Sequence, residues 1–260
     1  MKKAFFVILI IAIAAFPTTV LTGCSPKFGK NTISFGPHTL TNNTWGAPKE
    51  EVLTSGIYLN EDNTFGWYWD RQNPLKMMTS DSFVKPIFPN VRIGATVSVE
   101  SNSKYFPIKL KDINSLIFDV SYNYLTLPTG SYNLSFEMFL SDKNKPNENL
   151  VPTAEVMVWL HRNLFGQPAN TYQYDITDQN NTYGLYSWVM TDGHFYASFI
   201  MNGQPQFQGQ YRVDAKMMLD RLDLNPDWYL LGVQLGNEVM DGTGKIQIDH
   251  LVVTINGHKQ

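Results

Sequence analysis

Short alternating stretches separated by turn-forming residues run through most of this chain and restrict its fold more than any other feature. From Ile33 onward, polar and apolar side chains alternate within short segments, and clusters of Asn, Gly, Pro and Asp lie between them. Alternation of period two indicates strands with one covered and one wetted face, and the clusters are typical of turns. We therefore predict an all-β sandwich. The expected strands are Tyr58–Asn60, Phe65–Asp70, Asn90–Val99, Ser115–Tyr124, Ser131–Ser141, Ala154–His161, Tyr183–Met190, His194–Met201, Trp228–Leu235 and Lys245–Ile255.

One segment departs from this rhythm and predicts a helix. Asp214 lies near its start and Pro226 just after its end, positions at which these residues favour helix ends. We expect a single amphipathic helix over Val213–Leu224, packed beneath a sheet. Its apolar residues recur near helical spacing; they are Val213, Met217, Met218 and Leu222.

The composition indicates one folded domain outside the nucleic-acid-binding classes. Of 260 residues, 43% are hydrophobic and 17% charged, which is enough apolar material for a sizeable core. No repeat or composition change marks a boundary, so we predict one domain over 32–260. The formal net charge is −3 without any Lys/Arg-rich run, which argues against nucleic acid as a partner. Aromatic residues make up 13% and favour stacking surfaces.

The N-terminus resembles a bacterial lipoprotein signal. Lys2 and Lys3 precede an apolar run that is short for a membrane-spanning helix, and small residues then precede Cys24. We predict a signal peptide over 1–23, acylation of Cys24 as a membrane anchor, and a tether over 24–31. An ordinary secretory signal with an incidental cysteine, or an uncleaved anchor, are the alternatives. All three place the folded part outside the cytoplasm.

The stretch from Glu155 to Leu160 combines a carboxylate with apolar neighbours. Strand alternation sends Glu155, Met157 and Trp159 to one face and the intervening apolar residues to the core. A carboxylate rarely lies in such a row without a partner or a task. We expect this face to line a groove for a ligand with apolar faces and hydroxyl edges.

A second carboxylate, Glu238, follows a strand whose parity directs it to the same groove. A solvated turn glutamate is the alternative interpretation. Two groove-facing glutamates are what glycosidic bond cleavage needs, because one attacks the anomeric carbon and the other protonates the leaving oxygen. Trp67 and Trp69 share a parity and either line this cleft or pack in the core.

Other chemistries find little support. The single cysteine and the scattered histidines disfavour zinc sites and thiol nucleophiles, and we expect no metal and no cofactor. His161 shares parity with Glu155 and is predicted at the surface or the groove edge. Neither a serine-hydrolase elbow nor a phosphate-binding glycine loop occurs.

The order of several motifs resembles glycoside hydrolase family 12, the compact jelly-roll endoglucanases. The resemblance spans nearly the whole chain after the signal, and its most specific segment is Glu155 to Trp159. The motifs are Asn42-Asn43-Thr44-Trp45-Gly46, Gly66-Trp67-Tyr68-Trp69, Pro89-Asn90-Val91, Tyr132-Asn133-Leu134-Ser135-Phe136-Glu137-Met138-Phe139-Leu140, Glu155-Val156-Met157-Val158-Trp159 and Gln234-Leu235-Gly236-Asn237-Glu238.

The resemblance implies a jelly-roll β-sandwich of two antiparallel sheets whose concave face binds a β-1,4-linked glucan, hydrolysed with retention of configuration. By position, Glu155 matches the nucleophile and Glu238 the general acid/base. Their carboxyl groups should lie about 5–5.5 Å apart, in environments that push their pKa values apart. Trp45 and Asn43 match residues that bind a sugar on the non-reducing side of the cut.

Met157 and Trp159 match residues beneath the nucleophile.

Two positions in this chain depart from the family pattern. Glu137 stands where the family commonly has an Asp that contacts the nucleophile, so its role in tuning Glu155 is open. Val239 and Met240 follow Glu238 where an aromatic residue is usual, which predicts weaker binding on the leaving-group side.

Three functions remain after this comparison. The leading hypothesis is a monomeric retaining endo-β-1,4-glucanase at the cell surface, acting on cellulose-type chains, mixed-linkage glucan or xyloglucan. A non-catalytic glycan-binding lipoprotein is the second. A laminarinase-like sandwich hydrolase is the third, although its typical Glu-x-Asp-x-x-Glu run is absent near Glu155.

Overall fold

The computed structural model describes residues 32–47, 51, 53–74, 85–96, 98–144, 152–166, 171–178, 181–204 and 206–260. The predicted signal peptide, tether and Cys24 lie outside these residues.

Strands dominate the described part of the chain. The elements are β1 (Thr32–Phe35), β2 (His38–Thr41), β3 (Thr54–Leu59), β4 (Phe65–Arg71), β5 (Asn90–Gly94), β6 (Ile108–Lys109), the 3-10 helix η1 (Leu110–Asp112), β7 (Leu116–Thr126), β8 (Tyr132–Ser141), β9 (Ala154–Asn163), β10 (Tyr172–Thr177), β11 (Thr182–Val189), β12 (Phe195–Met201), β13 (Gln208–Asp214), α1 (Ala215–Leu219), β14 (Tyr229–Gly236), β15 (Gly242–Ile255) and β16 (His258–Lys259).

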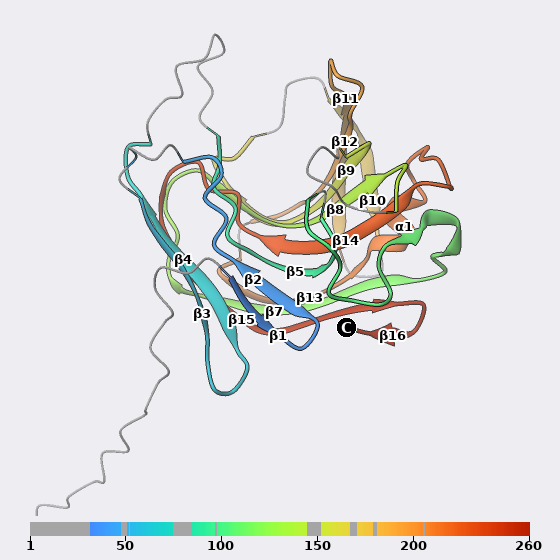
Figure 1. Ribbon diagram of the computed structural model, residues 1–260. Helices are drawn as coiled ribbons and strands as arrows, with labels where there is room; N and C mark the ends of the chain where they lie inside the picture. The colour runs from blue at the N-terminus through green and yellow to red at the C-terminus, as the bar shows by residue number, and fades with distance from the viewer. Residues whose placement is uncertain are drawn as a thin grey trace, which may run out of the picture.

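Two sheets form a jelly-roll sandwich, which confirms the predicted fold class. The larger sheet has the order β1-β2-β5-β14-β8-β9-β12-β11-β10, with β6 pairing to β14. The smaller has the order β13-β7-β15-β4-β3, with β16 pairing to β15. All pairings are antiparallel except β9 with β12. In Figure 1 the larger sheet curves into a cup that opens toward the top of the view, and the smaller sheet lies beneath it.

The core fills the space between the sheets. β7 buries every second residue from Leu116 to Tyr124, as a strand with one covered face should. Phe118 of the smaller sheet packs against Phe136 of the larger one, with ring centroids 4.4 Å apart. Burial of each such large apolar side chain contributes about 1.5–3 kcal/mol. This closed interior makes the curved sheet a rigid support for its outer, concave face.

The alternation predicted for the Glu155 strand is confirmed. Val156 and Val158 lie in the main core, whereas Met157 and Trp159 belong to a separate apolar cluster with Tyr196. Because that cluster lies on the opposite face of β9, it forms a second layer on the concave side of the sheet.

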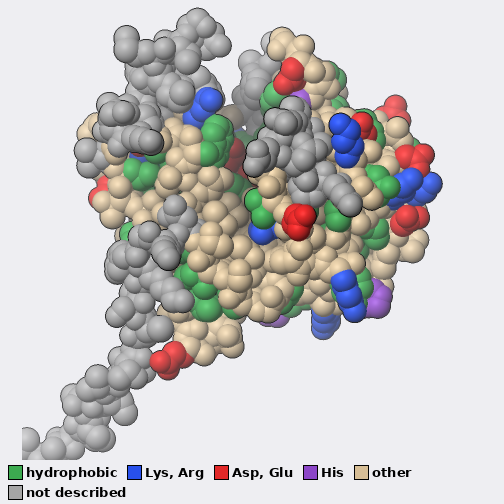
Figure 2. Space-filling model, viewed as in Figure 1, with side chains coloured by type: hydrophobic (Ala, Val, Ile, Leu, Met, Phe, Trp, Pro, Cys, Tyr) green, Lys and Arg blue, Asp and Glu red, His purple; other side chains and the backbone are tan. Residues whose placement is uncertain are grey.

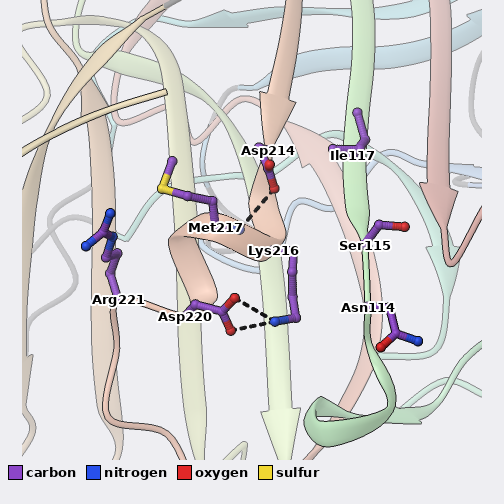
Figure 3. Close-up of a pocket in the computed structure, with 8 residues that line it drawn as sticks. All are labelled: Asn114, Ser115, Ile117, Asp214, Lys216, Met217, Asp220 and Arg221. Carbon is purple, nitrogen blue, oxygen red and sulfur yellow. Dashed lines mark hydrogen bonds and ion pairs between the residues drawn. The ribbon is translucent and has the colours of Figure 1, made fainter. Parts of the chain in front are cut away.

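The predicted helix is shorter than expected. α1 covers Ala215–Leu219, and Val213 belongs to β13. The side chain of Asp214 accepts a hydrogen bond from the backbone N of Met217 at 3.0 Å and caps the helix start, as Figure 3 shows. Beyond the helix, Leu222 and Leu224 still pack on the core from a turn. Their apolar spacing therefore reflects packing of an irregular segment rather than further helix.

Strand boundaries depart from the prediction at the sheet edges. The strand expected over Asn90–Val99 ends at Gly94, which has φ +92°. β1, β2, β10 and β13 were not predicted. β10 lies at the edge of its sheet and buries only Ile176 among its six residues, so it carries little of the burial pattern that marks a central strand. Within the described residues, no helix is long and apolar enough to cross a membrane.

Candidate active site

Three glutamates gather on the concave side of the large sheet. Glu155 is on β9, Glu137 is on β8, and Glu238 follows the end of β14. Glu137 lies directly opposite Met157 in the ladder, and residues opposite one another point to the same face. Glu155, two residues from Met157, shares that face. One strand, β8, separates β9 from β14, so their backbones are about 10 Å apart.

Asn133 of β8 holds Glu238 through three hydrogen bonds. Its Nδ2 donates to Glu238 Oε2 at 2.5 Å, and its Oδ1 accepts from the backbone N of Glu238 at 3.0 Å. The backbone N of Asn133 also donates to the carbonyl oxygen of Glu238 at 3.0 Å. One amide side chain therefore fixes both the backbone and the carboxyl group of this residue.

The neighbouring Asn237 anchors the same turn in the core. Its Oδ1 accepts from Trp67 Nε1 at 2.8 Å, and its Nδ2 donates to the hydroxyl of Tyr124 at 2.9 Å and to the carbonyl of Asn133 at 2.6 Å. Asn237 is fully buried, where unmade hydrogen bonds are costly. The three bonds hold the chain rigidly just before Glu238.

Glu155 stands above an apolar floor. Beneath it, Met157 Sδ receives hydrogen bonds from Trp159 Nε1 at 3.4 Å and from the Tyr196 hydroxyl at 2.6 Å. His194 lies beside the carboxyl group, with Nε2 3.9 Å from Glu155 Oε2. β12 runs parallel to β9, so the start of β12, where His194 precedes it, comes next to the start of β9.

Burial raises the pKa values of all three carboxyl groups, and repulsion adds to the shifts of Glu155 and Glu137. Burial, followed by the charge of Glu238, raises the pKa of Glu155 to about 8. Burial raises that of Glu238 to about 7, and the Asn133 amide opposes this shift. For Glu137, burial and then the charges of Glu238 and Glu155 raise the pKa well above its usual range. The environment therefore raises both the Glu155 and the Glu238 pKa, and the expected separation of the two values stays a prediction.

Glu155 and Glu238 come from the strands on either side of β8, the strand that carries Glu137. The charge of Glu238 raises the pKa values of both other glutamates. The two glutamates predicted from remote parts of the chain thus face one site. Glu137 is 4% exposed, and this burial is the largest cause of its raised pKa.

Trp45 extends the site beyond the carboxyl groups. It is 58% exposed, and its backbone N donates to Asn43 Oδ1 at 3.2 Å. A Cβ on the next residue, Gly46, would lie 1.9 Å from the carbonyl oxygen of Pro86, so only glycine allows this turn to pack so closely. The indole is thereby presented outward on a fixed turn, with Lys85 Nζ 5.5 Å from its ring centroid.

Arg71, which the sequence analysis missed, connects this turn with the Glu238 segment. Its guanidinium donates to the carbonyls of Gly46 at 3.3 Å and Val239 at 2.8 Å. It also forms a buried ion pair with Glu51, with Nε 2.6 Å from Oε1. A guanidinium can serve several acceptors at once because its donors form a planar fork. Arg71 thus ties together the two segments that bring Trp45 and Glu238 to the site.

Two of the predicted binding residues do not reach the cleft. Trp67 and Trp69 lie on β4 of the smaller sheet, 0% and 2% exposed within the core. Strand alternation correctly assigned Trp67 and Trp69 to the same face of β4, but that face lies in the core between the two sheets. The prediction that they contact substrate is therefore wrong, and Trp67 acts on the site only through Asn237.

Met157 and Trp159 are on the concave side as predicted but are 0% and 1% exposed. They form the layer under the site. His161 was predicted at the surface or groove edge, and this is also wrong. A β-bulge between Leu134 and Ser135 in the β8–β9 register turns His161 inward, where its Nε2 lies 2.8 Å from the Tyr132 hydroxyl.

Sequence reasoning also missed groups that the pairing of distant strands brings in. Asn133 shares strand parity with Glu137, and this signal was available. His194 and the tilted aromatic pair Trp188–Tyr196, with ring centroids 4.2 Å apart, come next to the Glu155 strand because β12 pairs in parallel with β9. No local sequence pattern predicts that pairing. Among the described residues, no group of three His, Cys, Asp or Glu side chains is arranged to hold a metal ion.

A curved β-sandwich with coupled carboxyl groups on its concave face can perform acid/base and nucleophilic chemistry on an extended polar chain. In Figure 2 the surface is hollowed at the top of the view, on the side toward which the larger sheet opens in Figure 1. These features define the class of polysaccharide-processing β-sandwich hydrolases.

The comparisons with known proteins give the family. The model of glycosyl hydrolase family 12 matches residues 36–256, and the chain belongs to this family. It is a glycoside hydrolase by this membership. Endoglucanase S of Pectobacterium parmentieri is 25% identical over 220 residues, which cover 80% of this chain and 78% of the relative.

Solved structures agree in fold. A family 12 xyloglucanase from Bacillus licheniformis superimposes with a TM-score of 0.75 at 24% identity, covering 87% of this chain and 97% of the other. Endoglucanase cel12A from Rhodothermus marinus gives 0.67 at 18% identity, covering 86% and 93%. Both likenesses establish the jelly-roll fold.

Proposed function

We propose that this glycoside hydrolase is a retaining endo-β-1,4-glucanase acting on cellulose-type, mixed-linkage or xyloglucan chains. The observation that carries the proposal is that Glu155 and Glu238 come from the strands on either side of β8, which carries Glu137 between them. Double displacement requires two such neighbouring carboxyl groups. The name of the relative, Endoglucanase S, supports cleavage of internal bonds in a glucan.

In the proposed first step, ionised Glu155 attacks the anomeric carbon while Glu238 gives its proton to the leaving glycosidic oxygen. A bond forms between the carboxyl oxygen and the anomeric carbon, and the glycosidic C–O bond breaks. In the second step Glu238 takes a proton from water, the water oxygen bonds to the anomeric carbon, and Glu155 leaves as a carboxylate. Asn133 keeps Glu238 in one orientation through both steps.

Glu137 and Trp45 complete the proposed site. A protonated Glu137 adds no negative charge beside Glu155, which favours the ionised nucleophile over an arrangement with three charged carboxylates. Trp45 offers an exposed indole on which a pyranose ring can stack, with Asn43 bracing its turn. Val239 is buried against Ile87, so the residue directly after Glu238 offers no stacking surface.

The decisive experiment measures reducing-sugar release from carboxymethyl cellulose, mixed-linkage glucan and xyloglucan. Wild type should release sugar from at least one of them, and Glu155→Gln and Glu238→Gln should each lose at least about a thousandfold. Glu61→Gln, on an exposed turn, is the matched control. Equal activity in all four proteins would end the proposal. Tight glycan binding without turnover in wild type would instead favour a binding lipoprotein.

We also propose that Cys24 is acylated and anchors the catalytic domain, as a monomer, outside the cytoplasm. The support is the sequence pattern alone. Wild type should sediment with membranes and extract into detergent, whereas Cys24→Ser should not carry a lipid mass. Equal partitioning and equal mass of the two processed proteins would contradict the anchor.

A further inference from the structure

His194 is held in one orientation beside Glu155. Its Nδ1 lies 2.8 Å from the carbonyl oxygen of Pro152, and its backbone N donates to Asp192 Oδ1 at 3.0 Å. The His194 side chain is 7% exposed. Because a carbonyl oxygen only accepts hydrogen bonds, Nδ1 must carry a proton whether the ring is neutral or charged. The ring therefore has a fixed tautomer.

The fixed tautomer leaves Nε2 as the nitrogen that faces the carboxyl group of Glu155, at 3.9 Å. A neutral ring turns a lone pair toward the carboxylate, which is unfavourable. A protonated ring turns an N–H of a cation toward it. Imidazole is the side chain that ordinarily changes charge between pH 5 and 8.

We propose that His194 is a positioning residue whose protonated imidazolium keeps Glu155 ionised for attack. This inference rests on the proposed function, in which Glu155 is the nucleophile.

The charges around Glu155 favour this role. Glu137 faces it from β8 and Glu238 from the end of β14, and the charge of Glu238 opposes its ionisation. Tyr196, opposite Glu155 on β12, places its hydroxyl on Met157 Sδ. In the described part of the chain, His194 is the one basic side chain within ion-pair distance of Glu155.

The groups around His194 itself are few. Asp192, in the preceding turn, binds its backbone N. Asp142 and Lys143 follow β8, where the Asp142 backbone N donates to Thr153 Oγ1 at 3.3 Å, and both are exposed. Solvent screens such exposed charges, which leaves Glu155 as the dominant partner of the buried Nε2.

The same charge serves the second half of the reaction. When water displaces the sugar from Glu155, the carboxyl oxygen leaves with a negative charge. An N–H cation at 3.9 Å stabilises that charge as it develops, as fixed dipoles and cations do in enzyme sites. His194 thus favours a charged Glu155 both at the start and at the end of the cycle.

The test compares wild type, His194→Gln and His250→Gln. His250 is exposed on β15 of the smaller sheet, so it is a matched control for loss of an imidazole. The profile of kcat/KM against pH is measured on a soluble glucan, and the titration of the Glu155 carboxyl carbon is followed by 13C NMR, assigned with Glu155→Gln.

Loss of the cation should move the acid limb of the profile, and the Glu155 titration, to higher pH by about one unit or more in His194→Gln. His250→Gln should leave both unchanged. His194→Asn serves the same purpose where the Gln variant does not fold. An unchanged titration of Glu155 without His194, or an equal shift in His250→Gln, overturns the inference. Because the titration requires no turnover, an inactive wild type would refute the proposed function while the NMR result still decides the role of His194.

Discussion

The two halves of the site are built differently. The Glu238 half is fixed by amide hydrogen bonds that reach into the core, through Asn133 and through Asn237 to Trp67. The Glu155 half rests on an apolar floor, and its charged neighbour is His194 at ion-pair distance. The proposed acid/base, Glu238, gives a proton to the leaving oxygen and later takes one from water, so its carboxyl group must be placed accurately. The proposed nucleophile, Glu155, must instead stay ionised. The two supports match these two demands.

The largest effect is expected from removing the Asn133 amide. Asn133→Ala should lower kcat by about 10- to 100-fold, because hydrogen bonds to charged groups contribute about 1.5–3 kcal/mol. The amide favours the ionised form of Glu238, so its loss raises the pKa of Glu238 and moves the basic limb of the pH profile upward. A lower kcat with an unmoved basic limb would show that Asn133 supports the fold rather than Glu238.

A smaller effect is expected further from the carboxyl group. Trp67→Phe keeps an aromatic ring but removes the donor to Asn237, and should lower kcat by about tenfold. Trp69→Phe is the matched control, because Trp69 Nε1 is buried without a hydrogen-bond partner in the described structure. Comparable activity in the two variants would break the proposed link from the core to Glu238.

Substrate binding should depend on Trp45 with little effect on the chemical step. Trp45→Ala should raise KM about 2- to 12-fold at nearly constant kcat, because stacking on an aromatic ring contributes about 0.5–1.5 kcal/mol. Trp45→Phe should recover part of the loss. A fall in kcat without a change in KM would assign Trp45 to the chemical step instead.

The smallest effect concerns stability. The pKa of Glu155 rises from 4.5 to about 8 on folding, so the folded state binds more protons in this window and its stability falls as pH rises. At pH 8, Glu155→Gln should therefore unfold at a higher temperature than wild type. The advantage should vanish near pH 4, and Glu61→Gln should show neither effect. Thermal unfolding followed by circular dichroism at both pH values provides the measurement.

The local sequence pattern predicted those features of the fold and site that depend on the residues of a single strand. Alternation was enough to assign the two faces of the Glu155 strand, and the turn clusters were enough for the β-sandwich. Alternation also grouped Trp67 with Trp69, but it could not say which face is the interior, because both faces of β4 carry aromatic residues. The bulge that turns His161 inward breaks the period on which the prediction depended.

Features set by distant pairing could not be predicted. His194 reaches Glu155 because β12 lies parallel to β9, and the Arg71 connections join segments far apart in sequence. The raised pKa values of Glu155 and Glu238 depend on burial and on nearby charge, which sequence spacing does not contain. The family resemblance named these carboxylates but gave no information on their local environments.

The most direct test of the paired-carboxylate mechanism is the stereochemistry of the first product. Proton NMR within the first minutes of cello-oligosaccharide hydrolysis distinguishes the two anomers before they interconvert. With Glu155 as nucleophile and Glu238 as acid/base, the newly formed reducing end should appear first as the β-anomer. Initial release of the α-anomer would mean a direct attack by water and would contradict the assignment of Glu155.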